Sequence, residues 1–359
     1  MENSKKRILS KAVKKVILLI FLNSIQSVYA QNLEKEKQYY LAAIGFWNVE
    51  NLYDTLNDRW KNDEEFTPAG LNAWTGERYR LKIEHLADVI SQMAMEATPD
   101  GLALIGLCEV ENKNVIQDLL NSPKLKPRHY QFIHIDGPDS RGVDPSFIYN
   151  PAYFKVMKAE SYPVLLVTDP AYKTRDILVV SGFFLGEPLT VLVNHWPSRR
   201  GGELASRPNR IAAAKTARHI ADSISAGDLK MKLIIMGDLN DDPVNASVKE
   251  YIRTCASIQL THEGCYFNPM EKLYREGIGT LAWNDSWNLF DQLLLNKNWI
   301  PGNYNTWQYY TVRIFNKSFL KTEAGPFKGY PLRTYSSKIY TGGYSDHFPV
   351  YMIIAKEKK

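Results

Sequence analysis

The chain has 359 residues, of which 45% are hydrophobic, and this is enough to bury the core of one large domain or two ordinary ones. The formal net charge of +5 is misleading, because residues 1–30 hold six basic side chains and one acidic side chain. Removing these from the totals of 44 basic and 39 acidic residues leaves 38 of each sign. A balanced chain has no general affinity for polyanions, so phosphate binding must come from a local cluster.

The first thirty residues have the composition of an export signal. A basic region precedes the apolar stretch Val16–Leu22, and Val28-Tyr29-Ala30 stands before Gln31. This pattern predicts a secretory signal cleaved after Ala30, a mature domain of residues 31–359, and a periplasmic or extracellular location. The alternative is an uncleaved membrane anchor, for which the apolar stretch is short. No later segment is apolar enough to span a bilayer, so we expect no stable membrane insertion after cleavage.

The first expected strand, residues 38–47, ends in polar residues. Asn48 and Glu50 follow it and alternate onto one face. A polar loop covers residues 54–76, and a covering helix is expected after it. The apolar stripe of that helix consists of Ile83, Leu86, Ala87, Ile90, Met93 and Ala94.

A second apolar strand, residues 101–110, carries Glu109 at its end. A carboxylate beside an apolar run is costly unless it has a partner such as a metal ion. Asn112 is a good N-cap for an expected helix over residues 113–121.

Residues 130–189 predict an antiparallel meander with strands at 130–135, 146–149, 154–167 and 177–185. A turn between the first two strands holds Arg141, which we interpret either as a substrate-binding residue or as half of a solvated surface pair. Cys108 lies inside a strand and is expected to pack as a small hydrophobe. Cys255 and Cys265 are close enough in sequence to form a disulfide, and the sequence leaves this open.

The best local phosphate site follows the expected strand 188–194. His195 ends this strand, and Ser198 and Arg199 come before two glycines. Arginine binds phosphate oxygens bidentately, and glycine lets backbone N–H groups approach an anion. The alternative is a histidine packed on Trp196 with solvated arginines. A helix is expected over residues 209–224.

The stretch 231–240 is the centre of the prediction. Its apolar run suits a strand buried on both faces, and it breaks at Gly237 before Asp238 and Asn240. These two side chains point the same way and can share one ligand, although such a sequence is also an ordinary turn. A helix over 243–255 and a long loop over 260–289 are expected next.

The C-terminal part supplies the remaining polar strand ends. Asp291 begins an apolar strand that runs to residue 295, and residues 296–342 are rich in aromatic side chains. Asp346 and His347 precede the closing strand 350–355. No internal repeat or linker is visible, so one catalytic domain is favoured.

Amide, carboxylate and imidazole groups thus end or begin six separate apolar strands. Hard oxygen ligands without cysteine select Mg²⁺, with Mn²⁺ or Ca²⁺ as alternatives, over zinc. Such ions suit the chemistry of phosphate esters.

The order of these motifs resembles the endonuclease/exonuclease/phosphatase (DNase I-like) superfamily, and in particular its secreted bacterial members. The matching stretches are Phe46–Asn51, Gly106–Val110, Asn194–Pro197, Gly237–Asn240, Phe290–Leu294 and Ser345–Pro349. The resemblance covers nearly all of the mature chain. It implies an α/β fold in which two mixed, mainly antiparallel sheets pack face to face in a four-layer α-β-β-α sandwich, with the site at one rim.

The resemblance also implies roles for individual residues. Glu109, with Asn48, Glu50 and Asp346 around it, would hold the divalent ion. Asp238 and Asn240 would position the attacking water and help to deprotonate it. His195 would stabilise a non-bridging oxygen, and His347, oriented by Asp291, would transfer a proton or contact phosphate.

The function that follows is a secreted, metal-dependent phosphodiesterase, most simply a nuclease acting on DNA or RNA. Hydrolysis of phospholipid or sphingomyelin, or of phosphomonoesters, is the alternative on the same scaffold. Repair endonucleases carry Asn where this chain has Ser198, which argues against an abasic-site activity. A dinuclear calcineurin-type enzyme would need more histidines. Outside the enzymes, a non-catalytic binding module is the competing interpretation. The sequence does not indicate the oligomeric state.

Overall fold

The structure is a computed structural model that describes residues 37–283, 285–336 and 338–359. The chain divides into residues 1–38 and a compact unit of residues 39–359, and the fold below is that of the second unit. The predicted signal sequence lies outside the described residues. None of the helices in the described ranges combines the length and apolar character that a membrane crossing requires.

Two large sheets form the centre of the unit. The first has the strand order β14-β17-β1-β2-β4-β3 and the second the order β5-β6-β7-β8-β13-β10-β9. In the first sheet the strands are β14 (Gln308–Ile314), β17 (Val350–Glu357), β1 (Tyr39–Leu52), β2 (Leu102–Val110), β4 (Asp144–Tyr149) and β3 (Gln131–His134). In the second they are β5 (Phe154–Tyr162), β6 (Ile177–Phe184), β7 (Glu187–His195), β8 (Lys232–Asp238), β13 (Asp291–Leu295), β10 (Tyr266–Phe267) and β9 (Thr254–Cys255). Most neighbours are antiparallel, but β1 with β2, β7 with β8 and β9 with β10 are parallel pairs.

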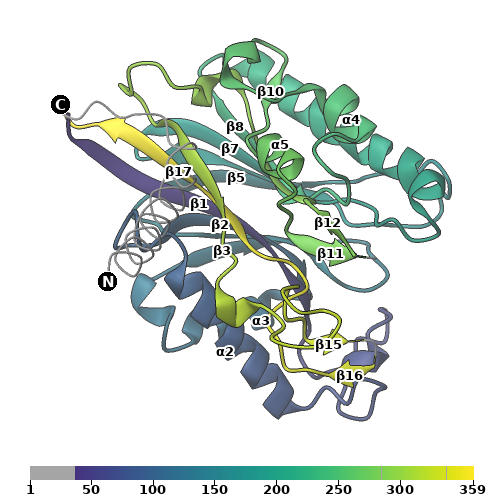
Figure 1. The fold of residues 1–359 in the computed structure, drawn as a ribbon. Coiled ribbons are helices and arrows are strands. Elements are labelled where there is room, and N and C mark those ends of the chain that lie inside the picture. The colour runs from purple at the N-terminus through teal and green to yellow at the C-terminus, as the bar shows by residue number, and fades with distance from the viewer. Residues whose placement is uncertain (1–36, 284, 337) are drawn as a thin grey trace, which may run out of the picture. The chain divides into compact units, whose positions relative to one another are not determined.

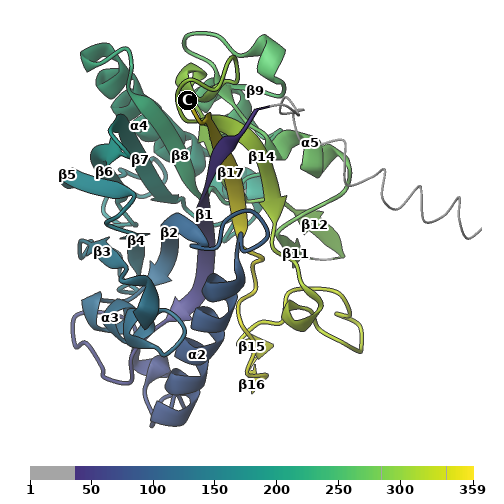
Figure 2. The ribbon, with the colours of Figure 1, turned by 90° about the vertical axis from the view of Figure 1, so that its left-hand side faces the viewer.

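Helices cover the outer face of each sheet (Figure 1). They are α2 (Gly76–Gln92) and α3 (Lys113–Asn121) on the first sheet, and α4 (Glu203–Gly227) with the π-helix Ser247–Arg253 on the second; α5 (Met270–Arg275) is short. Two small hairpins, β11 (Leu281–Trp283) with β12 (Ser286–Asn288) and β15 (Tyr335–Ser336) with β16 (Ile339–Tyr340), project beyond the sheets (Figure 2). The expected four-layer sandwich is confirmed.

Strand β1 shows why both faces of a central strand are apolar. Ala43, Trp47 and Val49 belong to the core that the first sheet shares with α2 and α3. Phe46 points the other way and approaches Gly106 and the second sheet. Because side chains alternate along a strand, Asn48 then falls on the inner face, between the two sheets.

Gly106 of β2 lets the two sheets approach each other. A Cβ added there would lie 2.5 Å from Met236 Sδ of the second sheet and 3.2 Å from a methyl carbon of Val193. We expect Gly106→Ala to lower the free energy of unfolding by about 1–3 kcal/mol, because overpacking forces the neighbours to shift. Urea denaturation measures this. Gly227→Ala is the control, since nothing lies within 4 Å of its added Cβ, and an equal loss there would contradict the packing argument.

Several expected elements are confirmed at their stated positions. Helix α3 has the predicted bounds, and the Asn112 side chain accepts hydrogen bonds from the N–H groups of Asn114 and Val115. The strands that carry the candidate site residues, β1, β2, β7, β8 and β13, are all present. Their long apolar runs identified them, because each is buried within the sandwich.

Other expectations were wrong. The predicted meander is divided, because β3 and β4 join the first sheet whereas β5 and β6 join the second. The helix expected over residues 209–224 begins already at Glu203 and contains Pro208. Only residues 247–253 of the range 243–255 are helical, and they form a π-helix. The expected loop 260–289 contains α5 and short strands, and β14 lies within a segment for which aromatic composition alone was noted.

The question of the cysteines is answered by the fold. Cys255 and Cys265 form a disulfide beside β9 and β10, and Cys108 is a buried free thiol, as its place within a strand predicts.

Candidate active site

Adjacent strands bring the central candidates together. Asp238, the last residue of β8, is in register with His195 of β7 on one side and with Asp291 of β13 on the other. From the opposite sheet, Asn48 Nδ2 donates a hydrogen bond of 3.0 Å to Asp238 Oδ2. The site therefore lies between the two sheets, at the ends of their central strands.

Both histidines face the carboxylate of Asp238. His195 Nε2 lies 3.7 Å and His347 Nε2 lies 3.8 Å from Asp238 Oδ2. His195 Nε2 is also 3.8 Å from Oε1 of Glu109. Residues separated by more than two hundred positions thus converge on one point, as a single active site requires.

The backbone is strained where these residues leave their strands. Glu50, Asn51, Glu109 and Asn240 have φ angles of 51°, 53°, 63° and 50°. The left-handed region is costly for residues other than glycine, and such residues gather at functional sites when the surrounding fold can hold them. The strain aims side chains from the strand ends into the site.

His347 is held by Asp291 through a hydrogen bond of 2.7 Å between Nδ1 and Oδ2. Although burial opposes it, the carboxylates of Asp291 and Asp238 raise the pKa of His347 well above its usual value. A protonated imidazole at this position can donate to an oxyanion.

His195 has the opposite character. Burial, with Arg175 nearby, holds its pKa well below the usual value, so the imidazole is neutral. Its Nδ1 is buried without a hydrogen-bond partner in the described structure. Burial also raises the pKa of Asp238 to about 6, which makes its carboxylate a better proton acceptor than an exposed one.

Glu50 and Asp346 form the second acidic part of the site. Burial first, and then Asp346, raise the pKa of Glu50 to about 7. Arg333 joins the two carboxylates, with Nη2 at 2.6 Å from Asp346 Oδ2 and Nε at 3.5 Å from Glu50 Oε1. Lys82 Nζ lies 3.9 Å from Glu50 Oε2.

These residues fit a hard divalent cation. The pKa of Glu50 stays high although Lys82 and Arg333 are close, so its carboxylate can accept further positive charge. Glu109 is a third carboxylate at the same rim. The amide of Asn48 also holds the site together, because its Oδ1 accepts the N–H of Glu50 and its Nδ2 donates to Asp238. Its Oδ1 has a second lone pair that can face a cation.

A second group of potential ligands, Cys108, His195 and Asp238, has donor atoms within 4.8 Å of one another. Burial raises the pKa of the Cys108 thiol well above its ordinary value, so the sulfur keeps its proton. A neutral thiol is a poor ligand for Mg²⁺, and the carboxylates remain the better donor set.

Arg141 lies beside Glu109 at the site. Its Nη2 lies 3.4 Å from Glu109 Oε2, and it also bonds the side chain of Asn51. Glu109 Oε2 accepts the N–H of Asn51 at 2.9 Å. Although burial opposes it, Arg141 and His195 hold the pKa of Glu109 well below its usual range, so this carboxylate is ionised.

The predicted phosphate-binding segment after β7 is joined to the loop after β8. Arg199 binds the backbone oxygen of Asn240 through Nε and the side chains of Asp241 and Asp242 through Nη2. Its guanidinium holds the loop after β8, and Ser198 is exposed on that side. Asn240 donates its N–H to Asp238 Oδ1 at 2.9 Å and its Nδ2 to the carbonyl of Trp196.

Three basic residues at the site were missed by sequence reasoning. Arg175 donates to the carbonyl of Trp196 at 2.8 Å and pairs with Asp139 at 3.3 Å. Arg333 lies in the aromatic segment and has no sequence signal that we recognise. Lys82 did carry a signal, because it stands on the apolar stripe of α2, where a lysine needs a buried partner.

Lys82 joins α2 to the segment that carries Asp346. It is only 2% exposed, and its Nζ donates to Thr334 Oγ1 and to the carbonyl of Tyr344, each at 2.7 Å. We expect Lys82→Met to lower the free energy of unfolding by about 3–5 kcal/mol, because it leaves a buried carboxylate and two acceptors without their cation. Urea denaturation measures this, with the exposed Lys230→Met as control; equal stability of the two variants would contradict the role.

The comparisons agree with this geometry. The sequence profile of the Endonuclease/Exonuclease/phosphatase family matches residues 43–356, which span both sheets and every candidate site residue, and the chain belongs to this family. No curated protein matches the sequence.

Solved structures show the same fold at low identity. Danio rerio TDP2 in complex with a single-stranded DNA product is 15% identical, with 88% of this chain and 98% of that chain covered and a TM-score of 0.52. An endonuclease/exonuclease/phosphatase family protein from Bacteroides thetaiotaomicron is 14% identical, with coverages of 89% and 96% and a TM-score of 0.53. A mannosyl-6-phosphatase from the same organism is 14% identical, with coverages of 87% and 99% and a TM-score of 0.52.

Proposed function

We propose that this protein is a divalent-metal-dependent phosphoester hydrolase, and specifically a phosphodiesterase. The observation that carries the proposal is the environment of Asp238. This residue is in register with His195, and its carboxylate faces His347 and accepts a hydrogen bond from Asn48. A proton acceptor lies there between a neutral and a charged imidazole. This arrangement suits attack of water on phosphorus.

Asp238, His195 and His347 have separate roles in the proposed reaction. Asp238, held by the N–H of Asn240, accepts the proton of the attacking water as its oxygen bonds to phosphorus. The N–H of the neutral His195 imidazole donates to a non-bridging oxygen as negative charge grows there. The protonated His347, oriented by Asp291, donates to a phosphoryl or leaving oxygen as the P–O ester bond breaks.

Glu109, Glu50 and Asp346 would hold the divalent ion, with Arg141 and Arg333 beside them. When bound, a hard cation such as Mg²⁺ draws charge from the phosphoryl and leaving oxygens. The charged guanidinium of Arg141 can also contact the phosphate, since its side chain is 37% exposed.

The finer proposal is hydrolysis of DNA or RNA after export through the signal sequence. A cavity of about 620 Å³ beside Asp346 and Arg333 supports it, because Trp283, Phe327 and Tyr330 line this cavity and could stack on nucleobases. The same apolar lining favours the lipid phosphodiesterase alternative, in which it would contact an acyl chain or a lipid surface.

One set of assays tests the function. Residues 31–359 are incubated with plasmid, RNA, sphingomyelin vesicles and bis(p-nitrophenyl) phosphate in Mg²⁺, Mn²⁺ or Ca²⁺, each with and without EDTA. We expect turnover of the chromogenic diester and of at least one natural substrate, loss of turnover in EDTA and its return on adding Mg²⁺ in excess. Absence of turnover with every ion would favour the non-catalytic binding module, and turnover that persists in EDTA would refute metal dependence.

A further inference from the structure

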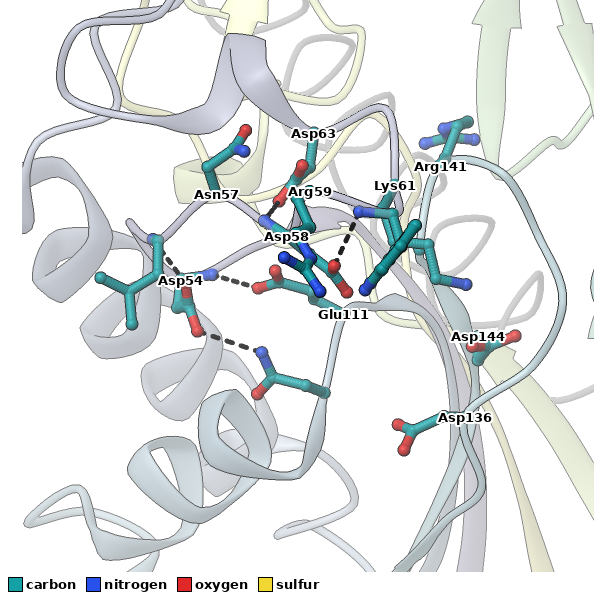
Figure 3. Close-up of a pocket in the computed structure, with 14 residues that line it drawn as sticks. Asp54, Asn57, Asp58, Arg59, Lys61, Asp63, Glu111, Asp136, Arg141 and Asp144 are labelled. Carbon is teal, nitrogen blue, oxygen red and sulfur yellow. Dashed lines mark hydrogen bonds between the residues drawn. The ribbon is translucent and has the colours of Figure 1, made fainter.

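Two guanidinium groups lie at the acidic rim of the active site, and their surroundings differ. Arg141 lines a cavity of about 610 Å³ beside the loop of residues 54–63, and acidic side chains dominate its walls (Figure 3). The six acidic residues are Asp54, Asp58, Asp63, Glu111, Asp136 and Asp144. Walls of this kind disfavour an anion. A phosphate-bearing substrate is therefore expected to extend toward the second guanidinium, that of Arg333.

Arg333 is held in place by two acidic residues. Its Nη2 donates a hydrogen bond of 2.6 Å to Asp346 Oδ2, and its Nε lies 3.5 Å from Glu50 Oε1. Both contacts use the edge of the planar guanidinium that carries Nε and Nη2. Within the described residues Nη1 donates no hydrogen bond, and the side chain is 41% exposed. Donors on the second edge of the guanidinium therefore remain for a ligand.

Two cavities share this guanidinium. One is the aromatic cavity of about 620 Å³, where Trp283, Phe327 and Tyr330 lie with Arg333. The other, of about 290 Å³, also includes Glu50 and is lined mainly by polar side chains. A phosphodiester carries two arms on one phosphorus atom. Two cavities on one cationic group thus match a diester better than a monoester.

The charges of the aromatic cavity single out Arg333. Among the described residues that line it, Arg333 is the one basic residue, whereas Asp285 and Asp346 are acidic. Asp285 is engaged by Tyr330, whose hydroxyl donates to it at 2.9 Å. An arginine keeps its charge at every physiological pH and presents a planar fork to phosphate oxygens. An anionic group in this cavity has Arg333 as its cationic partner.

We propose that Arg333 is a substrate-binding residue that holds the phosphate of a diester between the two cavities, with an aromatic or apolar arm against Trp283 and the second arm in the polar cavity. Asp346 and Glu50 fix the guanidinium through one edge, and the other edge donates to phosphate oxygens. The inference deepens the proposed function and rests on it for the nature of the ligand.

Calorimetric titration with diphenyl phosphate in saturating Mg²⁺ tests the contact. The comparison ligand is methyl diphenyl phosphate, which has the same two arms without the charge, and every protein also carries His347→Ala so that the ligand is not turned over. We expect Arg333→Met to raise the dissociation constant of the anion at least about tenfold, because a charged hydrogen bond is lost. The affinity for the neutral ester should stay unchanged. Equal weakening of both ligands would show an altered cavity shape and overturn the contact.

The matched control is Arg313→Met. Arg313 is also about half exposed and pairs with a carboxylate, Glu96 at 3.1 Å, but it lies on β14 and lines neither cavity. It should leave binding of diphenyl phosphate unchanged. An equal loss in the Arg313→Met and Arg333→Met variants would show non-specific attraction and overturn the proposal, as would tight binding of the anion by Arg333→Met.

Arg333→Lys covers the case in which the methionine variant does not fold. Lysine keeps one positive charge for Glu50 and Asp346 but has a single ammonium group in place of the planar fork. It should fold and bind diphenyl phosphate less tightly than the wild type by about threefold or more. A folded lysine variant with wild-type affinity for the anion would refute a contact that uses both edges of the guanidinium.

Steady-state kinetics with bis(p-nitrophenyl) phosphate separate substrate binding from a structural role. Arg333→Met should raise KM at least about tenfold with a smaller change in kcat. If Arg333 only neutralised Glu50 and Asp346, the substitution would change the Mg²⁺ requirement and leave KM unchanged, and the proposal would fall. Absence of turnover by the wild type would refute the hydrolase, whereas the calorimetric comparison would still decide whether Arg333 binds the anion.

Discussion

Replacing His347 by alanine is expected to lower kcat for the chromogenic diester by about 10²–10⁴-fold, with a smaller change in KM. The reason is that a protonated imidazole beside Asp238 acts mainly on charge that develops in the transition state. Steady-state kinetics in saturating Mg²⁺ measure the effect. His347→Gln is made in parallel, because it can keep a donor toward Asp291.

The control for this prediction is His219→Ala, since His219 is exposed on α4. It should retain full activity. Circular dichroism and thermal unfolding of each variant establish that the fold is intact. A His347→Ala protein that is folded and turns over diester at the wild-type rate would remove this residue from the mechanism.

Glu109→Gln is expected to raise the Mg²⁺ concentration for half-maximal activity by more than about tenfold and to lower kcat at a fixed low Mg²⁺ concentration. Glutamine keeps an oxygen that can accept the N–H of Asn51, so the strained turn is retained. It removes the negative charge that Arg141 stabilises and that a cation would need. Activity is measured across a Mg²⁺ titration.

Glu160→Gln serves as the matched substitution, because Glu160 lies on β5 and pairs with the exposed Lys158. It should leave the Mg²⁺ titration unchanged. If Glu109→Gln also leaves it unchanged while folding normally, Glu109 is not a metal ligand, and the carboxylates of Glu50 and Asp346 would have to hold the ion without it.

The candidate site was readable from the sequence where polar residues end apolar strands. Asn48, Glu109, His195 and Asp238 each follow a run of residues that is buried on both faces, and Asp291 begins another. Such runs are specified by local composition, and a polar side chain at their ends has to lie at the rim of a sheet. The local pattern therefore predicted that these side chains lie at strand ends, whereas the contact of Asn48 with Asp238 depends on how the two sheets pack.

Side chains in loops were harder to place. The sequence suggested that Arg199 binds phosphate, and it did not indicate that Nε and Nη2 of this side chain donate to Asn240, Asp241 and Asp242. An arginine side chain binds the acceptors that the fold brings near it. For Arg199 these acceptors lie more than forty positions away along the chain. The same holds for Arg333, whose position between Glu50 and Asp346 depends on how residues 321–346 return to the first sheet.

The strand pairing also lay beyond local pattern. Residues 130–189 alternate and turn as one meander would, but β4 pairs with β2 and β3 with β4, whereas β6 pairs with β7 and β5 with β6. The alternation of polar and apolar residues indicates that a strand has two different faces, but it does not indicate which strand lies beside it. The choice of sheet depends on which apolar surfaces and strand edges the rest of the fold leaves uncovered.

By itself, the amino-acid sequence determined the buried strands, the capped helix α3, the order of the polar motifs and hence the family to which they belong. Those features are local, since they depend on the periodicity of apolar residues and on the chemistry of strand ends and helix caps. The tertiary structure alone decided which charges meet. It placed Lys82 beside Glu50, joined Arg199 to the acidic loop after β8, and brought Arg333 between Glu50 and Asp346. The interaction between two charges depends on the distance between them in space, and that distance is fixed only when both sheets have packed.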